Sequence, residues 1–339
     1  MSTTKLLYSI VGTIGCSTNG FAVFILYNLQ NRCSTTNLLI TNQCIIDFLT
    51  SFVSLCLFLD SDIMTRLPDS SVAAELVCKF WSSKYIFWSS IYSSTANLVV
   101  LTFDRYFAVM YPLKYKIVKE KCRMKVMLLL IPWISGFGFV LLWLAAHTVK
   151  DRKCIQSWPS VEYQKAFGLL NGLYILIIPI GVMLFVYFRI FRALRRRVGS
   201  ISQGVSAISA ARRLNIIRTM LIVSVTYVIC WTPNQIAFIN FTLGGKFNFN
   251  GPLYYITVAM SLCNICINPI IYTFKYDDFR VGMRKTLPCL KAVPVPHDAI
   301  LPSGRGSSRI YPIEESKSHD QPKVPSGTSS GEAPGSSNS

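Results

Sequence analysis

The chain has few charged residues, and acids are the scarcest of them. Only 15% of its 339 residues are charged, and 16 Asp and Glu stand against 34 Lys and Arg, a net charge of +18. Soluble domains carry about a quarter charged residues. Hydrophobic residues make up 51% of the chain. The scarcity of charge therefore indicates a lipid bilayer, rather than water, as the solvent of most of the chain.

Groups for catalysis and metal binding are also scarce. The three histidines, His147, His297 and His319, lie at a predicted membrane edge or near the C-terminal end. The chain has no pair of CxxC units, and the lone Cys263–Cys266 spacing falls inside an apolar stretch without partner ligands, so no zinc site is expected. Because an enzyme needs convergent catalytic groups, we predict that the chain is not an enzyme.

Seven apolar stretches dominate the sequence instead. A spanning helix needs about 20 mostly apolar residues, and these are provided by residues 6–29, 38–59, 80–109, 126–146, 166–191, 216–242 and 252–274. None alternates like a barrel strand, and helices satisfy their own backbone groups in lipid. We predict an all-α membrane protein, a bundle of seven transmembrane helices. A transporter would need further spans or inverted repeats, which the sequence lacks.

The distribution of Lys and Arg orients the bundle. Basic residues favour the cytosolic connections, and they gather here in alternate segments such as 114–125 and 189–197. We expect a multi-pass plasma-membrane protein with its N-terminus outside the cell. The apolar run continues to Leu29, which favours a retained first helix over a cleaved signal peptide. The basic excess is expected to meet anionic membrane lipid, not nucleic acid.

Two regions follow from composition. Residues 1–291 are expected to form the seven-helix domain, including a short amphipathic helix eight that begins at Phe279. Residues 292–339 are rich in Ser, Pro and Gly without apolar periodicity, and are expected to be a disordered cytosolic tail.

Short polar motifs occupy fixed places on these spans. They are Asp104-Arg105-Tyr106 at the end of the third span, Pro112-Leu113 just after it, Cys230-Trp231-Thr232-Pro233 in the sixth, and Asn268-Pro269-Ile270-Ile271-Tyr272 in the seventh. Asn19, Asp47, Trp133, Pro179 and Tyr187 accompany them. In order and spacing, this set resembles the rhodopsin-like (class A) G-protein-coupled receptors from residue 8 to about 290, and most of all their peptide-receptor branch.

The resemblance implies a receptor that converts binding of an extracellular ligand into activation of a heterotrimeric G protein. Arg105 is expected to pair with Asp104 at rest and to meet Tyr187, Tyr272 and the G protein in the active state. Tyr106 and Leu113 complete this predicted G-protein switch. The tail is a further expected contact for arrestin and a receptor kinase.

Asp47 is the only acid deep within an apolar span. A charge at mid-bilayer costs at least ~2.5 kcal/mol, so such a residue faces the bundle interior and is functional by default. The resemblance places Asp47 with Ser94, Asn264 and Asn268 around a sodium ion that acts as a negative modulator; no other cofactor is expected. A hydrated Asp47 without an ion is the alternative.

Cysteines offer two further predictions. The resemblance implies a disulfide between Cys78 and Cys154, although Cys78 lies 27 residues before Arg105, slightly farther than in most relatives. Cys289, just beyond the amphipathic stretch, is a candidate for palmitoylation, with an ordinary free thiol as the alternative.

By resemblance, an aromatic ligand pocket with few charges is expected, lined by Phe87, Trp88, Ile91, Trp231, Gln235, Phe238, Tyr254 and Val258. Phe87 stands where amine receptors carry an Asp, and Leu262 stands where visual pigments carry the retinal Lys. Charges ring the mouth instead: Asp60, Asp62, Lys84, Lys150, Asp151, Arg152, Lys153 and Glu162. We predict a peptide ligand; a lipid or other small molecule, or a constitutively active orphan receptor, is the alternative.

Two positions depart from the family. Arg213 stands at the base of the sixth span where many relatives carry an acid, so an ion pair from Arg105 to that position is not available. Tyr227 replaces the usual Phe four residues before Trp231. The first change predicts a less constrained resting state.

Overall fold

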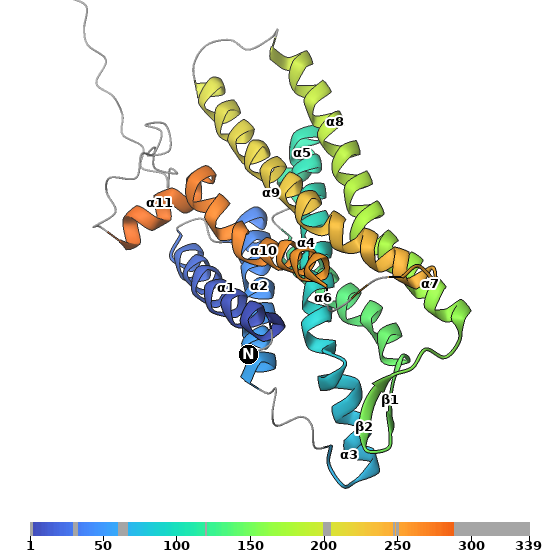
Figure 1. Ribbon diagram of the computed structural model, residues 1–339. Coiled ribbons are helices and arrows are strands. Elements are labelled where there is room, and N and C mark those ends of the chain that lie inside the picture. Colours follow the sequence, from blue (N-terminus) through green and yellow to red (C-terminus); the bar gives the residue numbers. More distant parts are fainter. Residues whose placement is uncertain are drawn as a thin grey trace, which may run out of the picture. The chain divides into compact units, whose positions relative to one another are not determined.

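The computed structural model describes residues 3–29, 33–59, 67–118, 121–198, 205–246, 248 and 251–287. Within them, seven helical stretches are long and apolar enough to cross a membrane, as predicted. They are α1 (Thr3–Tyr27), α2 (Thr35–Leu59), α4 (Tyr85–Met110), α6 (Cys122–Leu144), α7 (Val161–Gly172) continued by α8 (Ile178–Val198), α9 (Val205–Thr242) and α10 (Pro252–Lys275). Figure 1 shows these helices side by side in one bundle.

The bundle is apolar outside and partly polar inside, the opposite of a soluble domain. Large side chains such as Phe52, Ile134 and Leu184 are exposed on its outer faces, whereas Asn19, Asp47 and other polar residues are fully buried. Lipid tails can cover the apolar exterior, but buried polar groups need partners within the protein. The described arrangement therefore suits a bilayer and gathers the polar groups between the helices.

The third span, α4, is the most deeply buried and packs against α2, α6, α8 and α9. Its close contact with α6 depends on Gly136, because a Cβ there would lie within 2.7 Å of the Ser89 carbonyl and the Ser93 amide of α4. Small residues allow helix backbones to approach in membranes. α4 also packs against α2, where Ser94 and Asn97 make hydrogen bonds to Asp47 and Gln43.

The third span begins earlier than predicted. α3 (Ser71–Leu76) and a π-helical segment, η2 (Val77–Ser82), precede α4. A π-turn accommodates an extra residue, and Lys84 then adopts a left-handed conformation with φ 59°. These two irregularities account for the long spacing from Cys78 to Arg105. A second π-segment, η3 (Leu173–Ile177), lies between α7 and α8.

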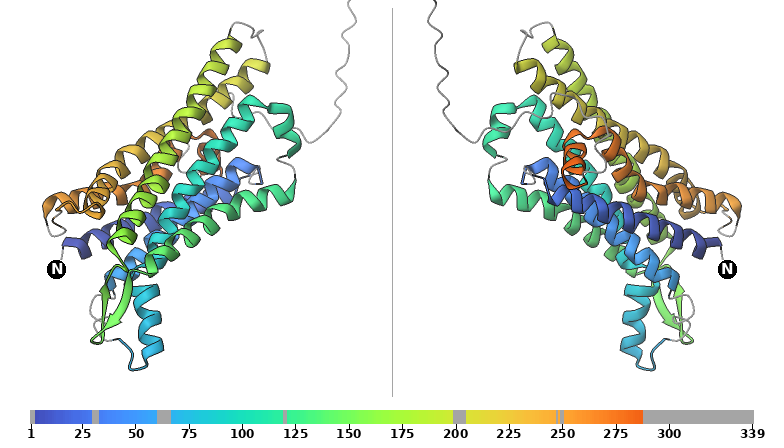
Figure 2. Two further views of the ribbon diagram at one scale, coloured as in Figure 1. Left: turned by 90° about the vertical axis from the view of Figure 1, so that its right-hand side faces the viewer. Right: turned by 90° about the vertical axis from the view of Figure 1, so that its left-hand side faces the viewer.

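The connections contain elements that the sequence analysis did not predict. Strands β1 (His147–Lys150) and β2 (Lys153–Gln156) form an antiparallel hairpin. Its two turn residues, Asp151 and Arg152, both have positive φ, a conformation usually signalled by Gly or Asn. Helix α5 (Pro112–Val118), also not predicted, follows α4, whereas α11 (Asp277–Thr286) follows α10 where helix eight was predicted. Figure 2 shows the hairpin and α3 at one end of the bundle and α5 at the other.

Candidate functional site

At the hairpin end, Cys78 and Cys154 form the predicted disulfide, with Cα atoms 5.3 Å apart. Glu75 on α3 adds two hydrogen bonds, because its Oε1 accepts from the Val149 amide at 3.0 Å and from the Thr148 hydroxyl at 3.3 Å. The hairpin is therefore held to the third span by one covalent bond and by a carboxylate.

Two cavities lie below the hairpin end and contain the predicted ligand pocket. The larger, about 60 Å³, includes Trp88, Ile91, Trp231, Gln235 and Phe238. The smaller, about 30 Å³, includes Phe87, Tyr254 and Val258, and shares Trp88, Ile91 and Trp231 with the first. All eight predicted residues thus line one or the other cavity. Neither cavity reaches the 300 Å³ or more of a typical ligand site, so ligand entry would require side chains to move.

Sequence reasoning missed the polar contacts of the larger cavity. The hydroxyl of Tyr92 donates to the side-chain oxygen of Asn171, whose nitrogen donates to Gln235 Oε1 at 2.7 Å. This chain of hydrogen bonds joins α4, α7 and α9 at the cavity wall. Asn171 gave no signal in the sequence, because a lone amide in an apolar span matches no motif.

Beneath the cavities, Tyr227 binds two other helices. Its hydroxyl lies 3.1 Å from the Thr95 hydroxyl of α4 and donates to the carbonyl of Ile175 in η3. The ring packs near that of Trp231, with centroids 6.2 Å apart. A Phe at this position could make the packing contact but neither hydrogen bond.

Deeper in the bundle, the Asp47 carboxylate accepts hydrogen bonds from two helices besides its own. Ser94 Oγ donates to Oδ1 at 2.8 Å, and Asn268 Nδ2 donates to Oδ2 at 3.0 Å. Gln43, which was not predicted, contacts both oxygens through Nε2 at 3.2 and 3.1 Å. Asn264 is buried one helical turn before Asn268 and makes no hydrogen bond to Asp47 within the described residues.

These contacts test the predicted sodium site. A carboxylate offers about four lone-pair sites, and three donor groups make four contacts with this one. A hard cation requires oxygen ligands, but Gln43 directs a nitrogen with its hydrogens at the carboxylate. As they lie here, the residues around Asp47 do not fit a sodium ion. The sodium prediction therefore rests on the family resemblance alone.

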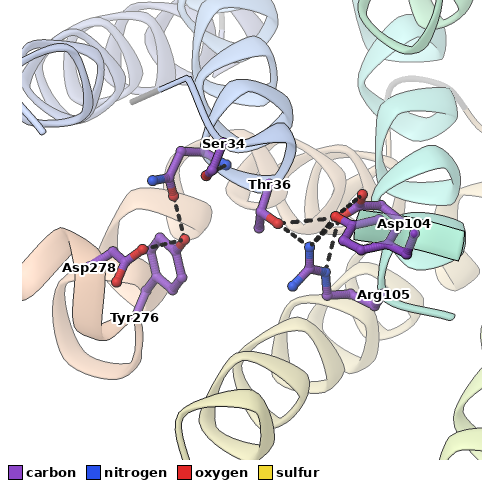
Figure 3. Close-up of polar contacts among 8 residues, drawn as sticks. Ser34, Thr36, Asp104, Arg105, Tyr276 and Asp278 are labelled. Atoms are coloured by element: carbon purple, nitrogen blue, oxygen red, sulfur yellow. Dashed lines mark hydrogen bonds and ion pairs between the residues drawn. The ribbon is translucent and has the colours of Figure 1, made fainter. Parts of the chain in front are cut away.

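At the opposite end, Asp104 and Arg105 form a buried ion pair at the end of α4. Thr36 on α2 bridges the pair: its hydroxyl donates to Asp104 Oδ2 at 3.3 Å and accepts from the Arg105 guanidinium. Figure 3 shows Thr36 beside both charged side chains. The predicted pairing of Arg105 with Asp104 is thus present, and it is held by a residue that sequence reasoning missed.

Helix α5 supplies another unpredicted contact to this pair. Tyr115 donates to Asp104 Oδ1 at 2.7 Å. Burial, and then the neighbouring Asp104 carboxylate, raise the pKa of Tyr115 above its ordinary value. The phenol consequently keeps the proton that it donates. Because α5 begins directly after α4, the Tyr115 hydrogen bond fixes α5 against the Asp104–Arg105 pair.

The other switch residues surround this pair at different depths. Tyr187 OH lies 3.0 Å from Ser224 Oγ, and the Tyr272 hydroxyl is buried without a hydrogen-bond partner among the described residues. Tyr106 packs on Tyr111 and Phe185, while Leu113 is 80% exposed. A cavity of about 290 Å³ borders Arg105, Thr36, Tyr115 and Ile217.

Some predicted features lie outside the described residues: Cys289, Asp60, Asp62 and the whole tail from 292 to 339. Helix eight corresponds to α11, which starts two residues before the predicted Phe279. That helix carries buried Phe279 and Met283 on one face and basic Arg284 and Lys285 in its last turn.

Comparison with known proteins identifies the family. Residues 18–272 match the model of the 7 transmembrane receptor (rhodopsin family). The chain is 26% identical over 293 residues to galanin receptor 2a of Danio rerio. This match covers 84% of the chain and 78% of that relative. It is 29% identical over 274 residues to the histamine H2 receptor of Homo sapiens, covering 76% and 75%. It is 28% identical over 290 residues to galanin receptor type 2 of Rattus norvegicus, covering 82% and 73%.

The family match covers most of the chain, including the ion pair of α4, the proline-containing α9 and α10, and the cavities between them. Members of this family are signalling receptors of the plasma membrane rather than enzymes. The chain accordingly belongs to the rhodopsin family of seven-transmembrane receptors and couples an extracellular ligand to a heterotrimeric G protein.

Proposed function

We propose that the ligand of this receptor is a peptide, bound with its N-terminal or C-terminal part in the two cavities and the rest across the hairpin. The observation that carries the proposal is the composition of the cavity walls. Aromatic and aliphatic side chains are joined there by the amides of Asn171, Asn234 and Gln235. A side-chain amide both donates and accepts, so it complements the amide groups of a peptide.

An amine ligand is the main competitor, because the relatives include histamine receptors as well as galanin receptors. A buried ammonium needs a paired opposite charge. Among the described residues lining the two cavities, there is neither Asp nor Glu, and Phe87 occupies the place of the amine receptors' acid. The walls therefore favour the peptide chemistry suggested by the galanin receptors.

The charges around the hairpin suit the remainder of a peptide. Lys150, Arg152 and Lys153 cluster at its tip beside Asp151, and Arg152 is paired with Asp69 at 2.9 Å. Lys84 adds another basic side chain at the start of α4. An acidic segment or a free carboxylate of the peptide would be attracted to this end, and such attraction mainly accelerates association.

The proposed orientation places the hairpin and the N-terminus outside the cell. Disulfides persist in oxidising compartments, and the Cys78–Cys154 bridge lies at the hairpin end. Two spans, α1 and α2, lie between the start of α1 and η2, so the start of α1 and Cys78 share a side of the membrane. The ion pair of α4 then faces the cytosol.

Activation is proposed to release this ion pair. Arg105 keeps its charge at any physiological pH and can exchange partners. The cavity of about 290 Å³ beside it is open to side chains of a G protein. The unpartnered Tyr272 hydroxyl supports a second state. A buried polar group without a partner costs about 1–3 kcal/mol, and the Tyr272 oxygen would accept a hydrogen bond from the Arg105 guanidinium by moving toward it. Tyr187 and Leu113 are proposed to contribute at the same surface.

Further partners are proposed for the cytosolic side. The basic last turn of α11 suits contact with anionic lipid headgroups. Arrestin and a receptor kinase are expected at the tail, and a palmitoyl group at Cys289, both outside the described residues.

A library screen tests the peptide proposal. Cells expressing the receptor would be treated with tissue peptide fractions, a peptide library, biogenic amines and lipid fractions, with G-protein activation as the readout. We expect activity in peptide fractions, lost after protease digestion of the fraction. Activity that survives digestion, or a response to amines alone, would contradict a peptide ligand.

Two variants make the screen specific. Arg105→Ala removes the charge-assisted partner of the G protein, and should abolish activation while leaving surface expression near normal. Asn171→Leu removes the amide between Tyr92 and Gln235 at the cavity wall. It should shift the concentration–response curve of an active peptide to higher concentrations without changing the expression level.

A further inference from the structure

Gln43 is the most unusual neighbour of Asp47. It lies one turn earlier on α2, is 3% exposed, and directs Nε2 at both carboxylate oxygens and at Ser94 Oγ. Its other polar atom, Oε1, accepts from Asn97 Nδ2 of α4 at 2.9 Å. Both ends of the Gln43 amide are therefore engaged inside the bundle.

The direction of this amide is fixed by a chain of hydrogen bonds that begins on α6. An indole nitrogen can only donate, and Trp133 Nε1 donates to Asn42 Oδ1 at 3.0 Å. The Asn42 nitrogen must then donate, which it does to Asn97 Oδ1 at 3.0 Å. The Asn97 nitrogen in turn donates to Gln43 Oε1.

Backbone carbonyls agree with this direction. Asn42 Nδ2 also lies 3.3 Å from the Leu129 carbonyl, and Asn97 Nδ2 lies 3.0 Å from the Leu39 carbonyl. A carbonyl oxygen can only accept, so neither amide can be reversed without placing two oxygens together. With Oε1 committed to Asn97, Gln43 has only its NH2 group to offer to Asp47.

We propose that the Gln43 amide takes the place of a sodium ion beside Asp47. Hydrogen bonds from Gln43, Ser94 and Asn268 compensate the carboxylate, and charge-assisted bonds of this kind are stronger than neutral ones. A cation could bind only after the Gln43 amide rotates, and rotation would break its bond to Asn97. The stability of the resting receptor is accordingly insensitive to sodium. The Asp47 carboxylate is held instead by a chain of hydrogen bonds between uncharged side chains that starts at Trp133.

Thermal denaturation of the purified full-length receptor tests this inference. Its Tm would be compared in sodium chloride and in choline chloride at equal ionic strength, because equal ionic strength keeps screening constant. We expect no sodium-specific rise in the Tm of the unaltered chain, since a ligand stabilises only a state that binds it. Gln43→Leu removes the NH2 group and should give a saturable sodium-dependent rise in Tm. Adding Asp47→Asn to Gln43→Leu should abolish it.

A second Gln43 variant and a direct measurement of sodium binding complete the test. Gln43→Met has the same chain length without a donor and serves if the Leu variant does not fold. The line width of the ²³Na resonance should increase when either variant is added, but not when the unaltered chain is added. A saturable sodium effect in the unaltered chain that Asp47→Asn removes would overturn the proposal. The proposal would also be overturned if both Gln43 variants showed neither a sodium-dependent rise in Tm nor a broader ²³Na resonance. Gln43 would then not be the group that excludes the ion.

Discussion

Asn215 on α9 donates a hydrogen bond to Asp277 Oδ2 on α11 at 2.6 Å. The same amide donates to the carbonyl of Lys275 at 2.9 Å, and so does the Thr219 hydroxyl one turn later. The inner part of α9 is therefore attached to the junction of α10 and α11. Arg213 cannot supply the acid that many relatives carry nearby, so this contact provides a restraint of a different kind.

Breaking that contact should raise basal signalling. A hydrogen bond to a charged group contributes about 1.5–3 kcal/mol, and about 1.4 kcal/mol changes a population tenfold. If the contact is lost when α9 moves outward, Asn215→Ala should raise ligand-independent G-protein activation by about tenfold. Activation would be measured in membranes at matched receptor density.

Thr226→Val is the matched control for this experiment. Its hydroxyl bonds only to the Ile222 carbonyl of its own helix among the described contacts, so basal activity should not change. Thr219→Val, which loses the Lys275 contact, should act in the same direction as Asn215→Ala. Unaltered basal activity in both Asn215→Ala and Thr219→Val would show that the contact does not restrain α9.

Tyr227 provides a second restraint, at mid-membrane. Tyr227→Phe keeps the ring beside Trp231 but loses the hydrogen bonds to Thr95 and to the Ile175 carbonyl. If these bonds exist only in the resting state, basal activation should rise several-fold, since each contributes about 1 kcal/mol. Surface expression should stay near normal. A fall in basal activity would mean that the hydroxyl stabilises the active arrangement instead.

The sequence predicted the parts of this structure that depend on repeated patterns. Seven apolar runs gave the seven spans, and the family resemblance carried by the motifs implied the charge pair, the disulfide and the cavity walls. The contacts it missed come from single polar residues such as Thr36, Tyr115, Asn171 and Gln43. Each becomes informative only when another helix brings a partner within about 3 Å, and no local pattern encodes that distance.

The irregular backbone segments could not be predicted from the sequence for a related reason. The π-segment η2 and the positive φ of Lys84 extend the third span without any Gly or Pro to mark them. The hairpin turn at Asp151 and Arg152 likewise lacks Gly. The disulfide and the Glu75 contacts attach the hairpin to η2 and α3, close in sequence to these positions.

The disulfide should behave as one unit with the hairpin. Cys78→Ser and Cys154→Ser each remove the same bond, so their losses in Tm should be equal and the double variant should be no worse than either. The bridge closes a separation of 76 residues, and a loop of that size corresponds to about 4 kcal/mol in the chain-entropy account. Cys122→Ser, at an exposed free cysteine, is the control and should leave Tm unchanged. Additive losses would mean that the two cysteines act separately.

His147 should make the hairpin end sensitive to acid. The residue is 9% exposed, and its ring packs on Trp143 with centroids 4.9 Å apart. Burial lowers the pKa of His147, and the weaker opposing effect is a contact of Nδ1 with the Trp143 carbonyl at 3.2 Å. The folded chain therefore holds the ring neutral at pH values where an unfolded chain would protonate it.

The sign of the effect follows from proton binding. Below the ordinary pKa of about 6.5 the unfolded state binds the extra proton, so stability is complete above that pH and falls as the pH drops through it. The Tm of the purified receptor should decrease between about pH 7.5 and about pH 5.5. His147→Phe keeps an aromatic ring against Trp143 without a titrating nitrogen, and should flatten this part of the curve. His297→Gln, outside the described residues, should leave the curve as it is. An equal decrease in the His147→Phe variant would assign the acid sensitivity to other groups.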